Sequence, residues 1–284
     1  MKRLSGLRVM VIGAHPDDPD VYAAGTAVKY VSEGARVVFL SLTNGDKGHR
    51  ELSPPELAAR RKGEAKHAAE TLGIEDYLVL DHPDCELEAT LENRWELIRI
   101  IRKFAPHVIF THRTCDYHAD HRACGTLVMD ATYLLGVPHC CPDTPIPNVA
   151  PVVFFLRDIF TVPREFRCDV AVDVGAVKDV MADGLLCHVS QFLEWLPPEN
   201  EGAVEALPKP GAPVEERRAF VRRFWHDARQ GQDVKRFDLP FEYAECFELS
   251  EYGRTPSASE LQGLFPAGTQ FRIAVGERGA LQNR

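Results

Sequence analysis

Two short segments, about a hundred residues apart, carry side chains that bind metal ions and move protons. The first, AHPDDPD at residues 14–20, places His15, Asp17 and Asp18 directly after the apolar run VMVIG. The second, THRTCDYHADHR at residues 111–122, includes His118 and His121. Neutral imidazole and carboxylate groups suit zinc or ferrous iron, and a catalytic site keeps one coordination position open. His15 and one aspartate from the first segment, with one histidine from the second, would form such a site.

Pro16, between His15 and the two acids, restricts the backbone of the first segment. A rigid loop can point neighbouring aspartates in different directions, so that one carboxylate binds metal while the other stays free as a base. The alternative for this segment is an ordinary loop with an aspartate cap on the next helix. The alternative for the second segment is a solvated helix start with His118 and His121 on one face. The presence of both segments in one chain favours the metal site.

The elements that position these residues follow from hydrophobic patterns in the first half of the chain. Short apolar runs alternate with stretches of helical spacing, which predicts an α/β, Rossmann-like fold with a mostly parallel sheet and helices on both faces. Strands are expected at 8–12, 36–42, 77–80 and 107–111, and helices at about 21–32, 55–72, 91–104 and 121–135. Ligands bind outside the carboxyl ends of such strands. Polar residues follow all four, including Asp46 after the second strand and Asp84 after the third.

The second half of the chain is less regular. Strands are expected at 152–156, 168–174 and 241–249, and helices at 175–195 and 217–225. The stretch 196–216 is rich in Pro, Gly and Glu, which predicts a flexible surface loop. We find no internal repeat and no clear boundary, so one domain over residues 1–284 with an elaborated C-terminal part is expected.

Composition narrows the class of partner. The 284 residues carry a formal net charge of -9, which disfavours nucleic acid and anionic membranes as partners. No apolar stretch reaches the roughly 18 residues of a membrane span, and the N-terminal apolar run is too short for a signal peptide. We therefore expect a cytoplasmic protein. The eight cysteines form no C-x-x-C pair, so they are expected to be reduced and mostly buried rather than zinc ligands.

Two motifs of the chain resemble those of a known protein family. AHPDD at 14–18 and YHADHR at 117–122 resemble the two signatures of the LmbE-like, or PIG-L-type, N-deacetylase family. Weaker likenesses extend the resemblance to about residue 250: Arg-x-x-Glu at 61–64, PDCEL at 83–87, HVSQ at 188–191 and YAECFE at 243–248. The resemblance implies a hydrolase that removes an acetyl or other acyl group from the amide nitrogen of an N-acetylglucosamine-type sugar or its conjugate.

The same resemblance implies a role for each matching residue. It makes His15, Asp18 and His121 the ligands of one divalent metal, zinc in the first place and iron as the alternative. Asp17 becomes the base that deprotonates the water on this metal, and a protonated His118 stabilises the oxyanion or helps the leaving amine. Asp120 would orient an imidazole. Arg61, Asp84 and Asp46 become substrate contacts.

Alternatives remain open for several of these assignments. Arg61 could instead be a helix-surface residue paired with Glu64 or Glu56, and His188 is expected to make a buried structural hydrogen bond. Pro19 stands where the family usually has Glu. A metallophosphoesterase is a competing interpretation, although no Gly-rich phosphate loop supports it. A non-catalytic sugar-binding relative is another. The expected partner is a small N-acetylated sugar or conjugate, with a homo-oligomer as a further expectation.

Overall fold

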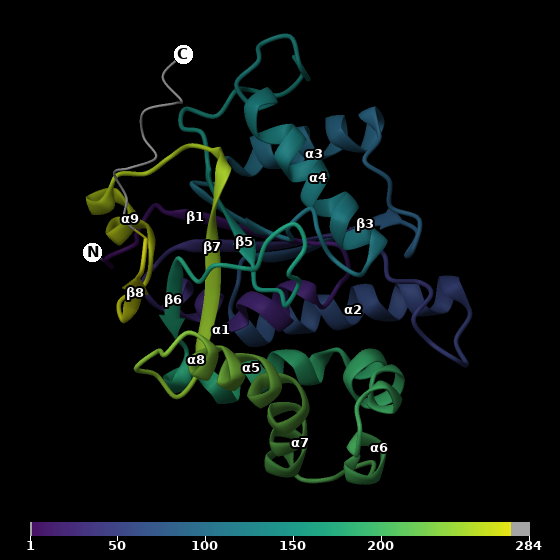
Figure 1. Ribbon diagram of the computed structural model, residues 1–284. Coiled ribbons are helices and arrows are strands. Elements are labelled where there is room, and N and C mark those ends of the chain that lie inside the picture. Colours follow the sequence, from purple (N-terminus) through teal and green to yellow (C-terminus); the bar gives the residue numbers. More distant parts are fainter. Residues whose placement is uncertain (1, 274–284) are drawn as a thin grey trace.

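The computed structural model describes residues 2–273, which form one mixed sheet of eight strands in the order β3-β2-β1-β4-β5-β7-β6-β8 (Figure 1). The strands are β1 (Arg8–Gly13), β2 (Arg36–Thr43), β3 (Asp76–His82), β4 (Val108–Thr111), β5 (Val152–Leu156), β6 (Val170–Asp173), β7 (Ala244–Gly253) and β8 (Thr269–Phe271). The first five strands pair in parallel, and the last three join the sheet through antiparallel pairs. The predicted α/β, Rossmann-like architecture is confirmed, with an antiparallel extension supplied by the C-terminal part.

The path of the chain creates a switch point beside β1. From β1 the chain proceeds outward to β2 and β3, and then returns to the other side of β1 to form β4. In open sheets of this kind the crevice outside the carboxyl ends of the strands at such a reversal is where ligands bind. The loop at 14–17, after β1, and the loop at 112–118, after β4, flank this crevice.

Helices cover both faces of the sheet, with α1, α2 and α5 on one face and α3 and α4 on the other (Figure 1). Their bounds are α1 (Asp18–Ser32), α2 (Pro54–Leu72), α3 (Leu91–Phe104), α4 (Ala119–Leu134) and α5 (Lys178–Cys187). Successive side chains of a strand point to opposite faces. Val9 and Val11 of β1 therefore pack in one core, and Met10 and Ile12 pack in the other.

Local sequence signals account for the helix ends. Ser53 and Glu56 form a capping box at the start of α2, with Pro54 in its first position. The helix ends at Gly73, whose φ of 70° is the left-handed conformation that glycine adopts at low cost. Helix α1 begins at Asp18, three residues earlier than expected, because Pro19 is tolerated in a first helical turn.

The C-terminal part departs in detail from the expected elements. The helix expected over 175–195 is interrupted at His188, after which Ser190–Trp195 forms a π-helical turn. The stretch 196–216, expected as a flexible loop, contains a 3-10 turn and a short helix with Ala203 buried, and its flexibility stays a prediction. The remaining elements are α6 (Ala203–Ala206), α7 (Val214–Val221), the π-helical Arg222–Gly231, α8 (Gln232–Arg236) and α9 (Ala258–Leu264). The sequence patterns had not indicated α9 or β8.

All eight cysteines are free, and four of them are buried. Over residues 2–273, no helix is both long enough and apolar enough to cross a membrane.

Candidate metal and catalytic site

His15, Asp18 and His121 bring two imidazole nitrogens and a carboxylate group together at the switch point. His121 Nε2 lies 3.3 Å from His15 Nδ1 and 3.3 Å from Asp18 Oδ1, and His15 Nδ1 lies 3.4 Å from Asp18 Oδ2. All three side chains are buried. Ligand atoms that surround a zinc ion tetrahedrally at about 2.0–2.1 Å are themselves about 3.3–3.4 Å apart. Two imidazole nitrogens and a carboxylate at this spacing fit one divalent metal of the zinc or iron type.

The loop after β1 is shaped to deliver Asp18 to this point. Asp18 Oδ2 accepts a hydrogen bond from the His15 backbone N–H at 2.7 Å, which folds the loop back on itself. A Cβ at Gly13 would lie only 2.6 Å from the Asp18 Cβ and 2.8 Å from the Pro19 Cδ. Glycine at the end of β1 is therefore required for this close approach. His112 Nε2, 3.2 Å from Asp18 Oδ2, contacts the carboxylate from the other side.

Three carboxylates face the histidine nitrogens that point away from the proposed ligand cluster. Asp116 Oδ1 is 3.2 Å from His121 Nδ1. Asp84 Oδ1 and Asp120 Oδ2 are 3.1 Å and 3.4 Å from His15 Nε2. A carboxylate on the far nitrogen of a metal-binding histidine fixes the orientation of the ring and makes it a better ligand.

Asp18 and His121 shift each other's pKa within the ligand cluster. Burial opposes ionisation of Asp18, but the charges of His121 and His112, with their hydrogen bonds, outweigh it and hold the pKa of Asp18 well below its usual value. Burial likewise lowers the pKa of His121, yet Asp18 and Asp116 more than compensate and raise it to about 9. Without metal, the pocket therefore holds an ionised Asp18 beside a protonated His121, and a bound metal would take the place of that His121 proton.

Asp17, the candidate base, is held by the buried Arg61 of α2. Arg61 Nη2 donates to Asp17 Oδ1 at 2.8 Å, and Nη1 donates to the Gly45 carbonyl oxygen at 3.2 Å. The Arg61 side chain is only 2% exposed. Gly45 has φ +66°, and a Cβ there would lie 2.3 Å from Arg61 Nη1. The residue expected as a substrate contact is thus directed at the proposed base.

The Arg-x-x-Glu and His-x-Ser-Gln segments, which looked unrelated in sequence, contact each other. Glu64 accepts hydrogen bonds from the Ser190 hydroxyl at 2.6 Å and the Ser190 backbone N–H at 2.9 Å. Arg60, not Arg61, pairs with Glu64, at 3.1 Å. The interpretation of Arg61 as a helix-surface residue paired with Glu64 or Glu56 is therefore wrong, because the side chain turns inward toward Asp17.

His188 is fully buried, as is its partner. His188 Nε2 lies 3.1 Å from Asp20 Oδ2, and neither side chain is exposed to solvent. Asp20 follows Pro19, so this pair anchors the end of the first segment to the break after α5. A buried structural hydrogen bond was expected for His188. Among the described residues neither of its ring nitrogens has a hydrogen-bond partner, and the structure shows the buried ion-pair contact with Asp20 instead.

His118 lies at the mouth of the site, half-buried, as the capping residue of α4. Its Nδ1 accepts a hydrogen bond from the Asp120 backbone N–H at 3.2 Å. A neutral His118 therefore carries its proton on Nε2. Burial, together with the charges of His15 and His121, lowers the pKa of His118 and favours this neutral form.

The other expected substrate contacts are already engaged with protein groups. Asp46 Oδ1 accepts a hydrogen bond from the Asp84 backbone N–H at 3.0 Å, and Asp84 faces His15. Asp120 accepts from the backbone N–H groups of Cys85 and Leu87, at 2.7 Å and 3.2 Å. These contacts join the loops after β2 and β3 and the start of α4 into one wall of the site.

Two further residues of the 111–122 segment, not among the candidate site residues, contact the cluster. His112 stacks on His121, with ring centroids 4.0 Å apart and an interplanar angle of 11°, and it contacts Asp18. Asp116 faces His121. Their positions directly after a strand, in the same polar segment as the candidate ligands, were the available signal.

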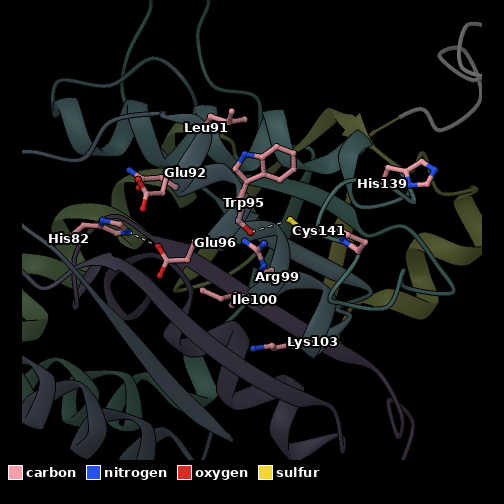
Figure 2. Close-up of a pocket in the computed structure, with 12 residues that line it drawn as sticks. His82, Leu91, Glu92, Trp95, Glu96, Arg99, Ile100, Lys103, His139 and Cys141 are labelled. Carbon is pink, nitrogen blue, oxygen red and sulfur yellow. Dashed lines mark hydrogen bonds and ion pairs between the residues drawn. The ribbon is translucent and has the colours of Figure 1, made fainter.

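A groove of the structure lies away from this chemistry, along α3 (Figure 2). It has a volume of about 1100 Å³ and runs between α3 and the loop at 139–142. Its polar lining includes His82, which is 2.8 Å from Glu96. None of the nine candidate site residues lines it.

Comparison with known proteins identifies the family. The family model described as PIG-L, GlcNAc-PI de-N-acetylase, matches residues 10–132. A diacetylchitobiose deacetylase of Thermococcus kodakarensis is 34% identical over 197 residues, which cover 66% of this chain and 71% of that protein. The chain belongs to the PIG-L family. Both signature segments fall within the matched range.

One further relative and one solved structure add to the comparison. A 1D-myo-inositol 2-acetamido-2-deoxy-alpha-D-glucopyranoside deacetylase of Thermobispora bispora is 32% identical over 134 residues, covering 37% of this chain and 44% of that protein. The structure of an N,N'-diacetylchitobiose deacetylase from Pyrococcus horikoshii superposes with a TM-score of 0.66 at 23% identity, covering 86% of this chain and 83% of that one. At this identity the superposition shows the shared fold.

Proposed function

We propose that this protein is a metal-dependent deacetylase that hydrolyses the N-acyl amide of an N-acetylglucosamine-type sugar or its conjugate. The observation that carries the proposal is the ligand-atom cluster of His15, Asp18 and His121, with Asp17 beside it in the chain. The family relatives support the reaction, because they are named deacetylases of acetamido sugars. The substrate is therefore a small sugar amide.

His15, Asp18 and His121 would hold the metal, for which we propose zinc. A divalent metal in this position polarises the amide carbonyl and makes water a nucleophile at neutral pH. The carboxylates on the far nitrogens of His15 and His121 would keep both rings turned toward the metal.

Asp17 acts as the general base in this proposal. It takes the proton of the attacking water, a role that requires a carboxylate kept out of the ligand set and aimed at the reacting centre. Its contact with Arg61 supports this role, since a buried two-point contact from Arg61 to Asp17 and Gly45 limits the positions open to the carboxylate.

His118 acts as a hydrogen-bond donor to the oxyanion in this proposal. Its Nε2–H is available because Nδ1 is occupied by the Asp120 backbone, so a neutral ring can donate to the developing oxyanion. The proton that Asp17 took from the water can then pass to the amine nitrogen as the C–N bond breaks. This refines the expectation of a protonated imidazole, since donation at Nε2 requires only the correct tautomer.

Acetate release tests the proposal. The purified protein, with its metal content measured on the same sample, is assayed on N-acetylglucosamine, N,N'-diacetylchitobiose and an N-acetylglucosaminyl-inositol conjugate. Asp17→Asn should lower kcat about 10²- to 10⁴-fold while the metal content is unchanged. Asp130→Asn, a half-exposed change on α4 away from the site, is the control.

Three results would contradict the proposal. Full activity in a metal-free preparation excludes the metal mechanism. Hydrolysis of phosphate esters without acetate release favours a metallophosphoesterase. Tight binding of acetamido sugars without acetate release favours a non-catalytic relative. A cytoplasmic location is part of the proposal and fits the eight free cysteines.

A further inference from the structure

A second set of potential ligand atoms lies at the mouth of the site. One ligand atom each from Asp84, Cys85 and His118 lies within 4.8 Å of the other two. None of these three residues belongs to the proposed His15–Asp18–His121 set. Asp84 and Cys85 come from the loop after β3, and His118 comes from the start of α4. Cys85 is exposed, so this cluster is open to solvent on one side.

The three groups are held in place by the wall of the site. The Cys85 backbone N–H donates to Asp120 Oδ2 at 2.7 Å, and the Cys85 Sγ lies 3.4 Å from Asp84 Oδ1. The Asp84 backbone N–H donates to Asp46 at 3.0 Å. The Asp120 backbone N–H occupies His118 Nδ1, which leaves Nε2 as the ring nitrogen able to bind a further group.

The chemistry of these donors selects the cation. A thiolate, a carboxylate and an imidazole favour borderline or soft metals such as zinc, whereas magnesium and calcium prefer oxygen ligands alone. Asp46, Glu86 and Asp120 surround the cluster with further negative charge, of which Lys47 neutralises only part through its contact with Glu86. Binding would release the thiol proton of Cys85 to solvent and move the His118 proton from Nε2 to Nδ1, which would give up its contact with the Asp120 backbone N–H. No oxidation state changes.

We propose that Asp84, Cys85 and His118 form a second cation site for zinc and other thiophilic divalent metals, and that its occupation inhibits the enzyme. Inhibition follows because the second metal takes His118 Nε2, the atom that donates to the oxyanion. It also engages Asp84, which orients His15. The inhibitory consequence rests on the proposed deacetylase function, whereas the binding of the cation does not.

Cadmium is the probe, because its bond to a thiolate gives an ultraviolet charge-transfer absorption. Protein that holds one zinc per chain is titrated with cadmium while zinc, cadmium, the absorption and acetate release are followed together. We expect one added cadmium per chain, retention of the first zinc, appearance of the absorption and loss of activity. Magnesium at the same concentration should produce neither the absorption nor the inhibition.

Cys85→Gly is the decisive variant. Glycine accepts the φ of +65° found at Cys85 and keeps the backbone N–H that bonds to Asp120, so basal activity should be retained. This variant should lack the absorption and need at least about tenfold more cadmium for half-inhibition, because a thiolate ligand is lost. Cys140→Ser, which removes another partly exposed thiol outside the site, should behave as the unmodified protein.

The binding readouts separate the two proposals. If no acetate is released from any substrate, the absorption and the metal count still decide whether the second site exists. An absorption that persists in Cys85→Gly overturns the site, as does displacement of the first zinc without any added metal. Equal sensitivity of the unmodified protein and Cys85→Gly to cadmium inhibition overturns the inhibitory role.

Discussion

Arg61 and Asp17 form a partly buried ion pair, in which Arg61 Nη2 donates to Asp17 Oδ1 at 2.8 Å. The two residues are 44 positions apart, on α2 and in the loop after β1. Because Arg61 is 2% exposed and its other terminal nitrogen contacts the Gly45 carbonyl, its guanidinium is directed at the base rather than at bulk solvent. The pair makes Arg61 a positioning residue for Asp17.

Replacing Arg61 with lysine tests this role. Lysine keeps the charge but cannot reach both Asp17 and Gly45 with a planar fork. We expect kcat to fall about 10- to 100-fold with metal content unchanged, since small misplacements of a catalytic group are costly. The Arg60→Lys variant, one position away on α2, should retain near-normal kcat. A raised KM at normal kcat would instead support the original assignment of Arg61 as a substrate contact.

Gly45→Ala should lower kcat as Arg61→Lys does, although both Arg61 and Asp17 stay unchanged in sequence. The added Cβ would lie 2.3 Å from Arg61 Nη1, and the φ of +66° disfavours alanine. We expect lowered kcat with retained metal, measured alongside thermal unfolding. Gly63→Ala on α2 is the matched control, because a Cβ added there would have no neighbouring atom within 4 Å. Unchanged kcat in Gly45→Ala would mean that catalysis does not depend on the exact position of the Arg61 side chain.

Asp116 should influence the affinity of the metal although it does not belong to the proposed ligand set. Its carboxylate lies 3.2 Å from His121 Nδ1, and loss of such a partner typically costs 10- to 100-fold in metal affinity or activity. Asp116→Asn should therefore release metal to a competing chelator at about 10- to 100-fold lower chelator concentration. Equal retention in the variant and the unmodified protein would show that Asp116 does not support His121.

Ser190→Ala should reduce stability more than it reduces metal binding. The change leaves the buried Glu64 Oε2 without its 2.6 Å hydrogen bond. An unsatisfied buried charged acceptor costs about 1–3 kcal/mol or more, so the free energy of unfolding in denaturant should fall by this order. Ser259→Ala, on the exposed side of α9, serves as the control. Metal content at saturating zinc should be the same in both variants.

Buried His226 should make the fold sensitive to mild acid. Burial, with the charges of Arg222 and Arg229, lowers its pKa to about 4. The unfolded chain binds a proton at this histidine below about pH 6.5, whereas the folded chain does so only near pH 4. The folded state therefore loses up to about 3 kcal/mol of stability as pH falls from 6.5 to 4.

His226→Leu should flatten this pH dependence. Denaturant unfolding between pH 4 and pH 7 gives the slope of the unfolding free energy, which should be smaller in the variant than in the unmodified protein. His67→Leu on the exposed side of α2 should leave the slope as it was. If the two slopes agree in His226→Leu and the unmodified protein, another group dominates the acid response.

Much of the fold could be predicted because its signals are local. Apolar runs and helical spacing depend on residues a few positions apart, and so do the capping box at Ser53 and the glycine stop at Gly73. The break at His188 could not be predicted, because it accompanies a buried contact with Asp20, 168 residues earlier. The antiparallel insertion of β7 between β5 and β6 is equally non-local.

The sequence by itself determined which residues could do the chemistry. His15, Asp17, Asp18, His118 and His121 follow strand ends, and parallel strands deliver their carboxyl ends to one edge. Only the tertiary structure decided which atoms meet: Arg61 with Asp17, Glu64 with Ser190, and Cys85 with Asp84 and His118. The physical reason is that strands and helices depend on the pattern of neighbouring residues. Side-chain partners depend instead on packing between elements that are distant in the chain.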